Sequence, residues 1–169
     1  MNRRLEQLQA LVLQHIGRYQ GLAGILEEEQ AALLSLDLDR IQQAAKAKET
    51  MVLKIKLLVP PLTQAIQDAA LSLGQEPEPL PTLAELAKAA PEPYAKDLER
   101  AGLTLARLKR GITRHNDANH AYVREALDLV SGSISILTRA VHPAKGSYLP
   151  TGQRARPSGY GPTKLSREV

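Results

Sequence analysis

Histidine side chains are the residues of this chain best suited to metal binding or acid–base chemistry. The sequence has four histidines and no cysteine, which excludes a zinc site built on thiolates. His15 and His115 fall on the apolar faces of two different predicted helices, and His120 follows His115 by five residues rather than three or four. We therefore expect packed, structural roles for His15 and His115, and neither a metal nor a cofactor.

Nucleophiles and phosphate-binding patterns do not indicate an enzyme either. No serine lies in a nucleophile-elbow pattern, and the only Gly-x-Gly, Gly159 to Gly161, has no strand before it that could form a phosphate loop. Glu27, Glu28 and Glu29 form an acidic run, which we interpret as a solvated helix face, and Glu29 also completes the three-four spacing of the apolar stripe on the same helix. The sequence predicts a protein that binds partners and has no catalytic residues.

The positive charge of the chain is concentrated at its end. The net charge is +4, and residues 142–169 account for all of it, so residues 1–141 carry equal numbers of basic and acidic side chains. Five cations spread over this tail are a weak signal for nucleic acid, and we expect no nucleic-acid partner. Three functions are possible for this tail: it solubilises the protein, it makes an electrostatic contact with nucleic acid or an anionic membrane, or it carries a peptide motif around Tyr148.

Two long segments without proline must position whatever site the chain has. All eleven prolines fall into three clusters, and alanine and leucine dominate the apolar residues, so the chain is predicted to be all-α. We expect an elongated antiparallel bundle of long helices with two arms, residues 3–73 and 94–141. Residues 1–141 form the predicted domain, with a connector at 74–93, and residues 142–169 are predicted to be a disordered basic tail.

Three local signals refine the boundaries of these helices. Ser35 and Asp37 can cap a new helix, so either a tight turn or only a kink would fit there. Pro60 and Pro61 end or bend the first arm, and its apolar spacing then resumes up to a left-handed cap at Gly74. Thr82 followed by Glu85 predicts a capping box and a short helix to about residue 90.

The helix at 94–141 changes character along its length. Up to Ile112 a single apolar stripe follows the three-four spacing of a helix, but after Asn119 a second stripe begins at Val123. Two stripes exceed what one partner helix covers. They indicate either burial between two helices of the same bundle or of a dimer, or a groove for a foreign amphipathic helix. Asn116 and Asn119, polar residues on the seam, would fix register or a specific partner.

No apolar segment approaches the roughly 18 residues of a membrane span, and the first residues do not resemble a signal peptide. We therefore expect a soluble cytoplasmic protein without stable membrane insertion.

Four short motifs, taken in order, resemble one known family. The motifs are Glu29-Gln30-Ala31-Ala32-Leu33-Leu34, Lys48-Glu49, Asn116-Asp117-Ala118-Asn119 and Ser147-Tyr148-Leu149-Pro150-Thr151-Gly152-Gln153. Their order and spacing resemble the FlgN family of flagellar type III export chaperones over roughly residues 5–153. The resemblance implies an all-helical cytosolic chaperone that keeps hook–filament junction proteins from assembling early and delivers them to the flagellar export gate.

The resemblance also implies where the two partners bind. The clients of the family present a C-terminal amphipathic helix, for which the expected contact residues are Asn119, Val123, Leu127, Val130, Ile134 and Leu137. Docking to the export gate is expected at Tyr148, Gly152 and Gln153. The alternative is a structural coiled-coil adaptor or homo-oligomer that permanently buries both stripes and transfers no client.

Overall fold

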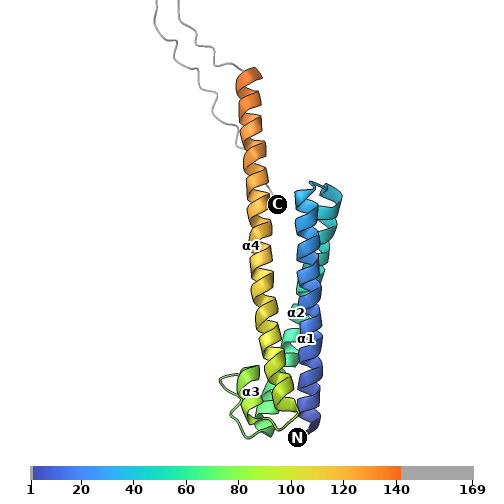
Figure 1. Ribbon diagram of the computed structural model, residues 1–169, viewed down its shortest axis with the longest axis vertical. Helices are drawn as coiled ribbons and strands as arrows, with labels where there is room; N and C mark the ends of the chain where they lie inside the picture. The colour runs from blue at the N-terminus through green and yellow to red at the C-terminus, as the bar shows by residue number, and fades with distance from the viewer. Residues whose placement is uncertain (1, 142–169) are drawn as a thin grey trace, which may run out of the picture. The chain divides into compact units, whose positions relative to one another are not determined.

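The computed structural model describes the backbone of residues 2–141 and the side chains of residues 3–139. It contains four helices, α1 (Asn2–Leu34), α2 (Leu38–Ser72), α3 (Leu83–Ala89) and α4 (Tyr94–Val141), and the described residues form no strand. Figure 1 shows α1 and α2 side by side, with α3 close to the first turns of α4. The predicted all-α fold is confirmed.

The chain divides into two units, Met1–Ala126 and Leu127–Val169. The first unit holds α1, α2, α3 and the part of α4 up to Ala126. Of the second unit, the structure describes the remaining turns of α4, which end at Val141. The predicted tail falls outside the described residues.

A tight turn at residues 35–37 separates α1 from α2. Leu36 adopts a left-handed conformation with φ of 53°, and the Asp37 carboxylate accepts a hydrogen bond from the backbone N–H of Arg40 at 3.1 Å. The Ser35 hydroxyl instead donates to the last carbonyls of α1. The sequence left a turn and a kink open, and the turn makes the expected arm at 3–73 a pair of antiparallel helices.

Helix α2 continues through Pro60 and Pro61. Both prolines lie on the exposed side, whereas Leu58 and Ala65 next to them are buried, so tertiary packing of the inner face maintains the helix where backbone hydrogen bonds are lost. The prolines therefore do not end the helix. It ends at Ser72, and Gly74 follows in the predicted left-handed conformation with φ of 72°.

The capping box predicted for the connector is present at the start of α3. The Glu85 N–H donates to the Thr82 hydroxyl at 3.2 Å, and the Thr82 N–H donates to the Glu85 carboxylate at 2.7 Å. This short helix buries Leu86 completely in the core of the first unit.

Within the first unit, α4 runs parallel to α1. The Tyr94 hydroxyl donates to Glu6, and the Gln9 amide donates to Asp97, so both contacts join residues 88 positions apart. Further along, Asn119 contacts Glu29, 90 positions away. This nearly constant separation is the register of two parallel helices with the same rise per residue.

Apolar side chains from all four helices fill the core of the first unit. One cluster joins the beginning of α1 to the end of α2, to α3 and to the beginning of α4, and its largest fully buried members are Leu5, Leu8, Val12, Leu86 and Leu98. A second cluster centres on Leu22, Leu26 and Ile55, with Ile112 of α4 packed against it. The three-four alternation of α4 thus identifies its buried face up to Ile112.

Candidate functional site

The predicted client-binding residues of α4 fall into two groups by burial. Five of them are exposed apolar side chains, whose exposed fraction ranges from 38% at Val123 to 62% at Leu137; the others are Leu127, Val130 and Ile134. Asn119, in contrast, is only 3% exposed. The five form an apolar stripe that nothing within the described chain covers, and Asn119 belongs to the interior of the first unit.

The other apolar stripe of the same segment is exposed as well. Leu129 is 73% exposed and Ile136 69%, although they continue the alternation that is buried earlier in α4. The two stripes lie roughly 100° apart around the helix. Burial between two helices of the same bundle was one alternative from the sequence, but in the single chain both stripes face solvent.

Asn119 connects α4 to α1 through two hydrogen bonds. Its side-chain amide donates to the backbone oxygen of Leu26 at 2.9 Å and to the Glu29 carboxylate at 3.0 Å. The other carboxylate oxygen of Glu29 accepts a hydrogen bond from the Lys48 ammonium of α2. One polar cluster therefore joins the three long helices of the first unit.

Glu29 differs from its sequence-based interpretation. Glu27 and Glu28 are exposed as expected, but Glu29 is buried. A carboxylate can be buried at modest cost when it is paired and hydrogen-bonded, and Lys48 and Asn119 supply those contacts. The acidic run is thus a solvated face at two positions and an internal polar contact at the third.

The oxygen Oδ1 of Asn119 is buried and has no hydrogen-bond partner in the described part of the chain. Leaving a buried carbonyl oxygen unpaired costs roughly 1–3 kcal/mol, and most native proteins satisfy such groups. Sequence reasoning found Asn119 because of its seam position, but it could not find the unpaired oxygen.

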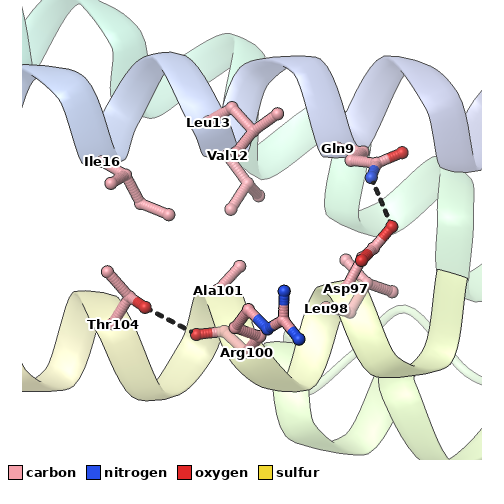
Figure 2. A pocket seen from close by; sticks show the side chains of 9 residues that line it. All are labelled: Gln9, Val12, Leu13, Ile16, Asp97, Leu98, Arg100, Ala101 and Thr104. Carbon is pink, nitrogen blue, oxygen red and sulfur yellow. Dashed lines mark hydrogen bonds between the residues drawn. The ribbon is translucent and has the colours of Figure 1, made fainter.

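A separate pocket of about 290 Å³ lies between α1 and the beginning of α4. Figure 2 shows Val12 and Ile16 of α1 pointing toward Ala101 of α4, with the hydrogen bond between Gln9 and Asp97 at one end. Leu13 and Arg100 lie at its exposed edge. No motif marked this pocket in the sequence, because it arises from small gaps in helix packing.

His15 is buried in the first unit, as predicted. Its ring meets Tyr19 edge to face, with centroids 4.9 Å apart, and the ammonium of Lys109 lies 5.7 Å from the centroid of the Tyr19 ring. Burial lowers the pKa of His15 below its ordinary value, and the positive charge of Lys109 lowers this pKa further. His15 therefore favours the neutral form. His115 is half-buried, and across residues 2–141 no three His, Asp or Glu side chains cluster in a metal-binding arrangement.

The predicted gate-docking residues Tyr148, Gly152 and Gln153 lie outside the described residues. No helix in the described part of the chain combines the length and the apolar character needed to cross a bilayer.

A helical bundle with an uncovered apolar helix surface is typical of proteins that bind other proteins. The family comparison agrees with this class. The chain matches the model described as FlgN protein over residues 1–156, and it belongs to that family of flagellar export chaperones. No curated protein and no solved structure matches the chain.

Proposed function

We propose that this chain is a cytoplasmic export chaperone for hook–filament junction proteins and that it binds their C-terminal amphipathic helix on α4. The contact surface is the stripe formed by Val123, Leu127, Val130, Ile134 and Leu137, named here the client stripe. The observation that carries the proposal is the exposure of all five side chains in a member of an export chaperone family.

The energetics of helix-in-groove binding favour this surface. Fully burying one exposed leucine, isoleucine or valine side chain contributes about 1.5–3 kcal/mol. The five side chains are 38% to 62% exposed, so each can contribute roughly half of this amount toward the free-energy cost of association. The stripe spans residues 123–137, which correspond to roughly 21 Å of helix. That length suits an amphipathic client helix of about four turns.

Delivery to the export gate is the second part of the proposal. We place this step at Tyr148, Gly152 and Gln153, which follow α4 in the sequence, because the motif around Tyr148 resembles the one with which the family docks on the gate. A tyrosine can bury a large aromatic face and still make a hydrogen bond in a receptor pocket. Tyr148→Ala should therefore reduce capture of the client-loaded chaperone by the cytosolic domain of the gate, with client affinity unchanged.

Co-purification with a hook–filament junction protein tests the client step. The complete client should bind, and a client lacking its C-terminal helix should not. Leu127→Asp and Ile134→Asp should lower client affinity about tenfold or more, because a charge placed in the interface must lose its hydration on binding.

Leu103→Asp is the matched control for these variants. Leu103 lies on the same helix and is 64% exposed, close to the 59% of Leu127 and the 58% of Ile134, but it is not part of the client stripe. Its substitution should leave client binding unchanged. Equal losses for all three variants would point to a general effect of charge on α4 and against the stripe.

A homodimer that permanently buries the same segment is the second candidate. It is favoured by the exposure of Leu129 and Ile136, since one client helix on the client stripe leaves the other stripe uncovered. Sedimentation at micromolar concentration distinguishes the chaperone from the homodimer. If the chain is a chaperone, it should bind the client without forming a stable dimer. If it is a permanent homodimer, the dimer should exclude the client.

A further inference from the structure

The middle of the first unit has basic side chains and no acidic ones, although residues 1–141 are neutral as a whole. The three long helices each contribute a stretch without aspartate or glutamate, namely residues 7–26 of α1, 50–67 of α2 and 101–116 of α4. These stretches meet at one level of the bundle, because Ile112 packs against the cluster that holds Leu22 and Ile55. Neither of the two ion pairs found among the described residues includes a cation of these stretches between residues 7 and 116, which are Arg18, Lys54, Lys56, Arg107, Lys109, Arg110 and Arg114.

Four of these cations lie within eight residues of α4. Arg107, Lys109, Arg110 and Arg114 all have exposed side chains. The ammonium of Lys109 lies 5.7 Å from the centre of the Tyr19 ring, so even this cation has an aromatic face rather than a carboxylate as its neighbour. The three arginines follow the three-four spacing that places them on one side of the helix, where like charges repel one another. A bound carboxylate would relieve this repulsion as well as form contacts of its own.

Two shallow hollows follow each other along this part of α4 and share Lys109. The first lies between α3 and α4, and its charged residues are Glu99 and Lys109. Its apolar lining includes Leu83, Ala84, Leu103 and Ala106. The second hollow is lined by Lys109, Arg110, Thr113, Arg114 and Asp117. Together the two hollows form a surface that is apolar at one end and positive at the other, named here the α4 groove.

The composition of the α4 groove favours an acidic protein segment as its occupant. Three cations outnumber the single Asp117 in its basic half, and a guanidinium can form paired hydrogen bonds with a carboxylate. The apolar half can bury one apolar side chain of the same segment. The residues that line the two hollows include no aromatic ring on which a nucleic-acid base could stack. Residues 142–169 of the chain itself have a net charge of +4 and do not complement the groove.

We propose that the α4 groove binds an acidic segment of a partner protein, with carboxylates against Arg110 and Arg114 and an apolar side chain in the hollow between α3 and α4. None of the residues that line the groove belongs to the client stripe. The inference therefore goes beyond the proposed function, because it assigns a second interaction surface to the first unit and does not depend on the client step.

A random peptide library displayed on phage tests the inference, with the full chain as bait. Peptides enriched by the wild-type chain should carry at least two aspartates or glutamates close to an apolar residue. Parallel selections with Arg110→Glu and with Arg114→Glu should not enrich them. Both arginines are exposed, so these variants should keep their fold, which circular dichroism checks. Arg100→Glu changes an exposed cation of the same helix outside both hollows, and this matched control should enrich the same peptides.

Fluorescence anisotropy of the most enriched peptide measures the size of each effect. Arg110→Glu and Arg114→Glu should each weaken binding about tenfold, and Arg100→Glu by less than about twofold. Raising the salt concentration from about 50 to about 300 mM should also weaken binding several-fold, because exposed charges are screened. Replacing the apolar residue of the peptide by serine should weaken binding about threefold or more, because the hollow between α3 and α4 then loses its guest.

Four results would overturn the inference. If no peptide is enriched, or if the enriched peptides lack acidic residues, the groove does not select an acidic segment. If acidic peptides bind Arg110→Glu and Arg114→Glu as tightly as the wild-type chain, they bind elsewhere. If a labelled oligonucleotide or an anionic vesicle binds through these arginines and no peptide does, the class of partner is wrong. If Arg110→Glu abolishes binding of a hook–filament junction protein, the groove is part of the client site and is not a second surface.

Discussion

Two parts of α4 have the same apolar pattern and opposite surroundings. In the first unit, Leu98 is 2% exposed and Leu105 is 8% exposed, whereas after Ala126 Leu129 is 73% exposed and Ile136 is 69% exposed. The three-four alternation runs through both parts without interruption. The pattern therefore identifies which face of a helix must be covered, but it does not identify what covers it.

The lengths of the helices explain where the difference begins. α1 and α4 are parallel with a separation of about 90 residues, and α1 ends at Leu34. This register places Leu34, the last residue of α1, level with about residue 124 of α4, close to the end of the first unit. The Glu29–Lys48–Asn119 cluster lies just before residue 124, and Asn119 is the last buried residue of α4 among those described.

The largest expected effect contrasts one leucine from each part of α4. Leu98→Ala should lower the free energy of unfolding by about 2–5 kcal/mol, because it removes a large buried side chain from the core of the first unit. Leu137→Ala should change it by less than about 0.5 kcal/mol. Urea denaturation followed by circular dichroism measures both, and a large loss for Leu137→Ala in the free protein would mean that this segment is already packed.

Breaking the polar cluster should have an intermediate effect. Lys48→Met leaves Glu29 buried with Asn119 as its remaining partner. This substitution should lower the free energy of unfolding by about 1–3 kcal/mol. The effect is smaller than for a fully buried ion pair because Lys48 is partly exposed. Lys46→Met, at an exposed position two residues earlier, is the control and should be nearly neutral. Equal stability of the two variants would show that the cluster does not hold the helices together.

Stability of the first unit should depend on pH through His15. Its pKa in the folded protein is below the 6.5 of an unperturbed histidine, because of burial and then of Lys109. As the pH falls below 6.5, the unfolded chain takes up the proton first, so the folded state loses stability until the pH passes the folded pKa. His15→Leu should flatten the plot of stability against pH below 6.5. If the slope is unchanged in this variant, groups other than His15 cause the pH dependence.

The smallest expected effect lies in the turn between α1 and α2. Leu36 is exposed and left-handed, a conformation that costs a residue with a Cβ about 1 kcal/mol relative to glycine. Leu36→Gly should therefore leave stability unchanged or raise it by up to about 1 kcal/mol in thermal melts. A clear loss would indicate that the leucine side chain makes contacts that outweigh the strain.

Local signals in the sequence predicted local structure well, since they act within a few residues. The capping box at Thr82 and Glu85, the cap at Gly74 and the bounds of α4 follow from such signals. The choice between turn and kink at residues 35–37 did not, because Leu36 is not a residue that normally marks a left-handed position.

Features that depend on the register between helices could not be predicted. Glu29 belongs to an acidic run, and only the hairpin of α1 and α2 brings Lys48 to it across 19 residues. The client stripe itself was visible in the sequence as surplus apolar width, and its function remains a proposal.

Hydrogen exchange of residues 127–139, with and without a client, tests the central claim most directly. A helix segment without packing partners opens easily, so these amides should exchange quickly in the free protein and become strongly protected when a hook–filament junction protein is added. Amides of residues 98–112 should be protected in both states. Strong protection of residues 127–139 in the free protein, or no change on adding a client that binds, would contradict the account.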